Sequence, residues 1–310
     1  MERYYGVRPA SPTVRRFPVL AALVVAGCLP RTLRAQAPDE GGVIAVQTFD
    51  KRGDLQASVV YGITRDRDGL LWIATDEGAA VFNGHDWRAV PMPSGTVNQA
   101  RSILAQRDGT MWFGTRDKVV RVRGRDTTVF TSAPDGLAPG SVYQLLEVGI
   151  FGGRQVLVSS FSGMARFDGT RWHRLDFPAD FPADGVVAAE TRDARGALEL
   201  WVASPNVGMR RWQADRWERI GPEQGLFLSN IEWLVVPGTP RADGTRLFAV
   251  GMEGVAALRG TRWSMVSGAP QQAFRAIDVA RRDGSRELWV GTTDRGLWRQ
   301  TAGGQWRPVR

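Results

Sequence analysis

The sequence is poor in the residues that most often build catalytic and metal sites. Its 310 residues include one cysteine, Cys28, and two histidines, His85 and His173. A single cysteine excludes a disulfide within the chain and any Cys-x-x-Cys motif. The two histidines have no partners at the spacing of a zinc site or of a histidine base. We therefore expect no metal, no cofactor and no catalytic residue, and we interpret the chain as non-enzymatic.

A long hydrophobic run is also missing. The apolar stretch near the N-terminus covers residues 17–27, whereas a membrane-spanning helix needs about 20 residues. This stretch follows Arg15 and Arg16, and basic residues before a short apolar segment are typical of a secretory signal. We predict a leader at residues 1–37 and export of the protein to the periplasm or the extracellular space.

Two routes of leader processing remain open. The residues Ala35-Gln36-Ala37 are small enough for cleavage by a signal peptidase. Residues 25–28 instead resemble a lipoprotein motif, in which Cys28 is lipidated. Membrane attachment follows only from the second route.

A strong charge of one sign is absent outside the leader. The net charge is +8, of which +5 lies in the first 37 residues, so the remainder carries +3. Acidic and basic residues are mixed along that remainder, which gives no electrostatic signature of nucleic-acid binding. We expect no nucleic-acid partner.

Helical periodicity is missing after the leader, and a short motif recurs in its place. Residues 68–75 read DGLLWIAT, residues 108–115 read DGTMWFGT, and residues 287–292 read ELWVGT. Degenerate copies lie at residues 156–160, 200–204 and 247–251. The central residues of the six copies are 40 to 47 positions apart: Trp72, Trp112, Leu157, Trp201, Phe248 and Trp289. An aromatic residue follows each of them: Trp87, Phe130, Trp172, Trp217, Trp263 and Trp306.

A period of this length is typical of the four-stranded blade of a β-propeller. We therefore predict an all-β propeller over residues 43–310, with six blades of four antiparallel strands and seven blades as the alternative. The expected blades cover residues 58–91, 97–131, 141–177, 185–221, 230–267 and 273–310. An additional strand at residues 43–49 is expected to pair beside the last blade and help to close the ring.

The recurring tryptophans and aspartates have structural explanations. A large planar side chain at one height in each sheet fills the space between neighbouring blades, so Trp72, Trp112, Trp201 and Trp289 are predicted to pack there. Asp66, Asp68 and Gly69 superficially resemble the start of a calcium loop, but the later acidic ligands are missing. We predict a tight turn at this position.

The motif at residues 66–78, Asp-x-Asp-Gly-x-x-Trp-Ile-x-Thr-x-x-Gly, resembles the repeat of two-component regulator propellers. In that family, such repeats form the periplasmic sensing part of hybrid histidine kinases, usually with seven blades. The resemblance implies an exported sensory propeller. Blades three to five depart from the motif, and the sequence contains no kinase module, so kinase activity is not implied.

In a propeller, the loops between the second and third strands and the starts of the inner strands lie on one face around a central funnel. Polar and aromatic groups around a concavity predict a binding site. The loops contribute Asp76, Glu77, Arg116, Asp117, Phe161, Asn206, Glu253, Asp294 and Arg295. The inner strands contribute Tyr61, Arg101, Tyr143, Trp233 and Arg275. The expected partner is an extracellular small molecule, for example a glycan, or a membrane sensor protein.

Two other functions remain as alternatives. One is a propeller hydrolase or lyase that acts on glycans, which would need a pair of carboxylates about 5 to 10 Å apart. The other is a structural scaffold for protein–protein interaction, which would show a flat apolar patch.

Overall fold

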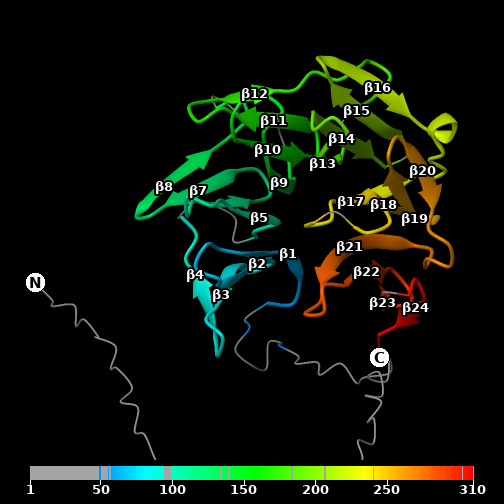
Figure 1. Ribbon diagram of the computed structural model, residues 1–310. Coiled ribbons are helices and arrows are strands. Elements are labelled where there is room, and N and C mark those ends of the chain that lie inside the picture. Colours follow the sequence, from blue (N-terminus) through cyan, green and yellow to red (C-terminus); the bar gives the residue numbers. More distant parts are fainter. Residues whose placement is uncertain are drawn as a thin grey trace, which may run out of the picture. The chain divides into compact units, whose positions relative to one another are not determined.

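The computed structural model describes Phe49, Leu55 and residues 57–309, except 94–98, 133–134, 139, 183, 206, 240 and 302 (Figure 1). The chain divides into two units, Met1–Gln47 and Thr48–Arg310, and all described residues belong to the second. The predicted leader, Cys28 and residues 43–48 of the additional strand lie outside the described residues. Within the described part of the chain, no helix has the length and apolar character needed to cross a membrane.

The second unit is an all-β propeller with six sheets of four antiparallel strands, as the repeat predicted. Blade one contains β1 (Val60–Arg65), β2 (Leu71–Thr75), β3 (Gly78–Phe82) and β4 (Trp87–Val90). Blade two contains β5 (Ser102–Ala105), β6 (Met111–Gly114), β7 (Val119–Arg123) and β8 (Asp126–Phe130). Blade three contains β9 (Val142–Val148), β10 (Gln155–Ser160), β11 (Gly163–Phe167) and β12 (Trp172–Arg174).

The remaining blades repeat this order. Blade four contains β13 (Val187–Arg192), β14 (Leu198–Ser204), β15 (Gly208–Gln213) and β16 (Arg216–Ile220). Blade five contains β17 (Ile231–Val235), β18 (Thr245–Gly251), β19 (Gly254–Arg259) and β20 (Arg262–Met265). Blade six contains β21 (Ala273–Ala280), β22 (Arg286–Thr292), β23 (Leu297–Gln300) and β24 (Trp306–Pro308). A single 3₁₀ turn, η1 (Pro222–Gln224), is the one helical element among the described residues.

The hydrophobic core lies between successive blades. Trp112 of blade two packs against Phe167 and Trp172 of blade three. Trp201 of blade four packs edge-on against Trp263 of blade five. These contacts confirm the predicted packing role of Trp112 and Trp201, which are 2% and 1% exposed.

The acidic residue before the second strand organises a turn, as predicted. One carboxylate oxygen of Asp66 accepts hydrogen bonds from the backbone N–H groups of Asp68 and Leu70, at 3.0 and 2.9 Å. The other accepts the indole N–H of Trp72 at 2.7 Å. Because all these bonds are internal, the carboxylate has a structural role. The described residues contain no group of side chains suited to hold a metal ion.

The side of blade one that faces away from blade two is covered differently from the matching side of the other blades. Phe113 and Val120 of blade two pack on blade one. The residues of blade one at the same two positions, Ile73 and Ala80, instead pack against Leu55 and Ala57, and Phe49 contacts this group. The segment that precedes blade one therefore covers this face.

Blade six keeps an uncovered face. Ile277 in β21 is 55% exposed, whereas Val235, at the same position in blade five, is 7% exposed. Ile63 on blade one is likewise 57% exposed. Blade six and blade one therefore leave apolar side chains in solvent that the other blades bury against each other.

Candidate functional site

Several hairpins between the second and third strands contain the same type of side-chain hydrogen bond. The hydroxyl of Thr75 donates to the carbonyl of Gly78 at 2.9 Å and accepts the backbone N–H of Glu77 at 3.1 Å. The hydroxyls of Thr115, Ser160 and Thr292 donate to the carbonyls of Lys118, Gly163 and Gly296. A side chain that bonds its own turn fixes the turn tightly. The predicted loop residues of blades one, two and six therefore lie on short, rigid tips.

The inner strands carry an extra residue near their start. The register between β1 and β2 shifts between Val60 and Gly62, which leaves Tyr61 without a partner residue. A register shift at the same place in blades three, five and six leaves three more residues without a partner residue: Tyr143 in β9, Glu232 in β17 and Phe274 in β21. A β-bulge of this kind redirects a side chain and is frequent next to binding sites.

Two of the predicted arginines lie on aromatic rings of the preceding blade. The guanidinium of Arg101 is 5.3 Å from the centre of the Tyr61 ring. Its Nε is buried and has no hydrogen-bond partner. A guanidinium stacked in this way is held in place while several donors stay available.

Arg275 has the same arrangement with Trp233, at 4.3 Å from the ring centre. Its Nη1 donates to the backbone carbonyls of Glu232 and Phe274, at 3.3 and 2.9 Å. Burial lowers the pKa of Arg275 from its usual value, and the nearby Glu232 opposes this only in part. The guanidinium thus bonds these two backbone carbonyls, and Glu232 acts on it only through its charge.

Two predicted acidic residues are engaged in loop structure. A carboxylate oxygen of Asp76 accepts the backbone N–H groups of Ser58 and Val59, at 3.0 and 3.1 Å. Glu253 accepts the N–H of Ser229 at 3.2 Å and also the hydroxyl of that residue. Desolvation raises the pKa of Glu253, but these hydrogen bonds outweigh it and the pKa lies below its usual value. Both carboxylates tie a hairpin tip to the start of an inner strand.

The other predicted residues lie apart from these contacts. Arg116 and Asp117 are exposed on the tip of blade two, and Asp294 pairs with Arg295 at 3.5 Å on the tip of blade six. Glu77 and Phe161 are exposed, and Tyr143 is half-buried. Asn206 lies outside the described residues. Among the predicted residues, the structure thus joins three pairs directly: Tyr61 with Arg101, Trp233 with Arg275, and the adjacent Asp294 with Arg295.

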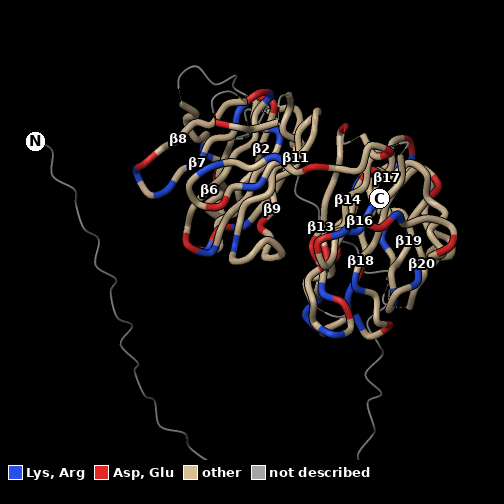
Figure 2. The backbone as a smooth tube through the Cα atoms, turned by 90° about the horizontal axis from the view of Figure 1, so that it is seen from above, with Lys and Arg blue, Asp and Glu red and all other residues tan. Residues whose placement is uncertain are grey.

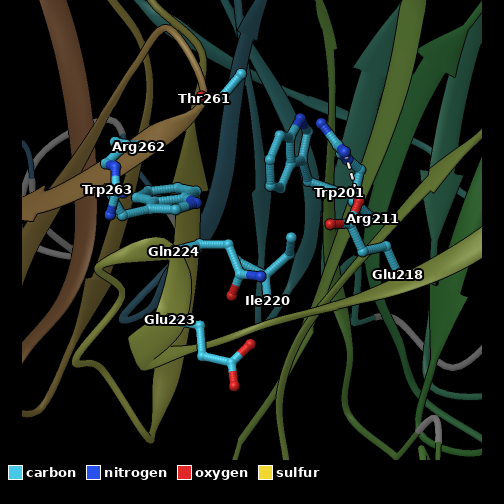
Figure 3. A pocket seen from close by; sticks show the side chains of 9 residues that line it. All are labelled: Trp201, Arg211, Glu218, Ile220, Glu223, Gln224, Thr261, Arg262 and Trp263. Carbon is cyan, nitrogen blue, oxygen red and sulfur yellow. Dashed lines mark hydrogen bonds and ion pairs between the residues drawn. The ribbon is translucent and has the colours of Figure 1, made fainter.

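A cavity between blades four and five was not predicted from the sequence (Figure 3). It has a volume of about 260 Å³ and is lined by Trp201, Arg211, Glu218, Ile220, Glu223, Gln224, Thr261, Arg262 and Trp263. The sequence contained one sign of this cavity. Ile220 occupies the repeat position at which blade two has the larger residue Phe130. A smaller residue at a repeat position leaves space between blades.

A second cavity, of about 480 Å³, lies between the loops of blades five and six. Its arginines, Arg241 and Arg286, both bond the carboxylate of Asp278, which is 1% exposed. Because this ion pair is complete within the protein, the two arginines here are structural.

A comparison with known protein families supports the resemblance that was inferred from the repeated motif. Residues 54–77, which contain the first two strands of blade one, match the family model described as two component regulator propeller. A search of curated protein sequences finds no match.

Three solved structures show the same fold. One is the extracellular domain of what is described as a hybrid two component system from B. thetaiotaomicron, with a TM-score of 0.65 and 15% identity. That match covers 85% of this chain and 36% of the other, so this chain spans about a third of that domain. Streptogramin B lyase has a TM-score of 0.59 and 16% identity, over 82% of this chain and 83% of the lyase. Virginiamycin B lyase from Staphylococcus aureus has a TM-score of 0.55 and 16% identity, over 80% and 83%.

Identities this low show a common fold and leave function open. The chain is thus a six-bladed β-propeller that carries a two-component regulator propeller repeat and is similar in fold to the extracellular domain of a hybrid two-component system.

Proposed function

We propose that this propeller is an exported, non-enzymatic sensory module that binds a ligand or a partner protein on the face of the β2–β3 type hairpins. The observation that carries the proposal is the pair of stacked arginines, Arg101 on Tyr61 and Arg275 on Trp233. Arg101 has a buried Nε without a hydrogen-bond partner, and the side chain of Arg275 donates to backbone carbonyls, with Glu232 acting on it only through its charge. Unpaired donors at partly buried positions are an energetic cost that a ligand can offset.

The similarity to an extracellular sensor domain supports the location of this function. The proposed ligand is a small extracellular molecule, such as a glycan, and the proposed partner protein is a membrane sensor. Basic and acidic residues are interspersed along the described blades (Figure 2). This mixed charge supports a function without nucleic acid.

A lyase activity is the alternative that the comparisons raise. A histidine-to-alanine variant of virginiamycin B lyase is described as catalytically inactive. Here His85 follows the turn residue Asn83, whose side chain accepts its N–H. His173 lies 2.5 Å from Asp168 in the β11–β12 hairpin. Because both histidines are in outer hairpins and neither lines a described cavity, they do not favour the lyase.

The proposal is tested by thermal unfolding of the purified protein with a panel of neutral and acidic mono- and oligosaccharides. We expect at least one compound to raise the melting temperature of the wild type and to lose this effect in the double variant Arg101→Ala with Arg275→Ala. A shift that survives in the double variant would place binding elsewhere.

A matched control replaces two exposed arginines of outer hairpins, Arg171→Ala with Arg216→Ala. This control should keep the ligand-dependent shift. If the first double variant is unfolded while the control is folded, the two stacked arginines are structural and the site assignment is wrong.

A further inference from the structure

The cavity between blades four and five is lined by a smaller residue, Ile220, at a position where another cleft holds a phenylalanine. In the cleft between blades two and three, Phe130 and Phe167 pack on Trp172 at 5.7 and 5.1 Å between ring centres. Strand pairing places Ile220 and Leu258 at these two positions in blades four and five. The tryptophans of this cleft, Trp201 and Trp263, remain. The two clefts therefore have tryptophans at the same positions, but the cleft between blades two and three is filled by phenylalanines and the cleft between blades four and five contains a cavity.

Two buried donors at this cavity have no partner. The indole Nε1 of Trp263, a residue 3% exposed, makes no hydrogen bond, and neither does the Nε of Arg211. Figure 3 shows the two side chains on opposite walls, with Trp201 between them. Trp172 also has an unpaired Nε1, but the phenylalanines fill the space around it. In the cavity between blades four and five, two unpaired donors therefore occur together with room for a ligand, whereas the cavity of blades five and six has one unpaired group among its described lining residues, the hydroxyl of Thr301.

Hydrogen-bond acceptors lie at the mouth of the cavity. The side chain of Glu218 is 41% exposed, and Glu223 and Thr261 are also exposed. The cavity thus offers donors on its inner walls and acceptors at its opening. A matching ligand has an oxygen acceptor at one end and O–H donors at the other.

The charges of the cavity favour an uncharged ligand. Arg211 already bonds two carboxylates, those of Glu199 and Glu218. Glu199 is fully buried and is also bonded by Arg246, so the charges at the inner wall are already balanced within the protein, and a ligand carboxylate there would lose hydration without gaining a free cation. The remaining charges, Glu223 and Arg262, cancel. Neither an anion nor a cation gains a net attraction.

We propose that this cavity binds a small uncharged molecule rich in hydroxyl groups. Its hydroxyl oxygens accept from Trp263 Nε1 and Arg211 Nε, and its O–H groups donate to Glu218 or Glu223. The volume of about 260 Å³ is below the usual range for drug-sized ligands, about 300 to 1,000 Å³, and suits a single hexitol or sugar ring. The site is separate from the arginine pairs and does not depend on the proposed sensory function.

The test is a titration of the ¹⁵N-tryptophan-labelled protein with sorbitol, observed through the indole N–H signals. Trp263→Phe and Trp172→Phe assign the two signals of interest. We expect a saturable shift of the Trp263 signal and none of the Trp172 signal. If the Trp263 signal does not move, or if both move alike, the proposal is wrong.

Gluconate tests the charge argument, because it has the size of sorbitol and a carboxylate at one end. Its dissociation constant should be at least about tenfold higher, which corresponds to about 1.4 kcal/mol. Equal affinity would overturn the inference of an uncharged ligand.

Ile220→Phe tests the site, because Ile220 lines the cavity and takes the position that Phe130 has in the filled cleft. It should abolish the saturable shift, and binding that persists in this variant would overturn the assignment. If Ile220→Phe does not fold, the wild-type titration of the Trp263 signal decides.

Discussion

The guanidinium of Arg275 lies over the ring of Trp233, 4.3 Å from its centre, and donates to the backbone carbonyl of Glu232 on the same neighbouring strand. One side chain therefore connects β21 to β17 without an ion pair. Desolvation of the cation opposes the contact, as the lowered pKa of Arg275 indicates. The stack orients the arginine more than it stabilises the fold.

Arg275→Ala should therefore cost little stability. A cation–π contact is worth about 0.5 to 2 kcal/mol, so we expect a loss of about 1 kcal/mol in the free energy of unfolding, measured by urea denaturation. Arg295→Ala on the exposed tip of blade six is the control and should have almost no effect. A loss above about 3 kcal/mol would show that Arg275 is a core residue.

The turn between β15 and β16 contains backbone strain that a glycine substitution can relieve. Ala214 and Asp215 have φ angles of 49° and 58°, which is the left-handed region that costs an ordinary residue about 1 to 2 kcal/mol. Ala214→Gly should raise the free energy of unfolding by about 1 kcal/mol, as measured by urea denaturation.

Gly260 provides the reverse experiment. It has a φ of 57° in the equivalent turn of blade five, and no atom lies within 4 Å of an added Cβ. Gly260→Ala should therefore destabilise the protein through backbone strain alone. The explanation fails if the two substitutions change stability in the same direction.

The exposed face of blade six predicts a contrast between two isoleucines. Ile231 is fully buried and Ile277 is 55% exposed. Ile231→Ala should lower the free energy of unfolding by about 2 to 5 kcal/mol, and Ile277→Ala by less than about 1 kcal/mol. Equal losses would mean that another part of the protein covers Ile277 in solution.

Glu147 makes part of the stability depend on pH. The hydrogen bond from Arg154 holds the pKa of this carboxyl below its usual 4.5; burial opposes this, and Gln106 donates a further bond at 2.8 Å. Because the folded pKa is the lower one, the contribution is complete above pH 4.5 and is lost as pH falls below it.

Glu147→Gln should thus be destabilising at neutral pH, and the difference from wild type should shrink in acid. Urea midpoints at neutral pH and below pH 4.5 measure this, with Asp117→Asn as a control on an exposed tip. A difference that stays constant with pH would contradict the assignment.

Most of the architecture could be predicted because it is local and repeated. Asp66 organises its turn through neighbours up to six positions away, and Trp112 and Trp201 recur at one height in their sheets. Such patterns are visible in the order of residues. The candidate site was predicted only in part, since the stacking of Arg275 on Trp233 joins residues 42 positions apart. The cavity was missed because it depends on the sizes of side chains from two blades at once.

The sequence alone determined the strand order of each blade and the turns and favoured six blades over seven, because these follow from alternation and from a motif repeated every 40 to 47 residues. Tertiary structure decided which polar groups are paired. Asp76 and Glu253 are used to fasten loops, whereas Arg101, Arg211 and Trp263 keep donors without partners. A hydrogen bond depends on distance and direction between residues from different blades, and neither can be read from spacing along the chain.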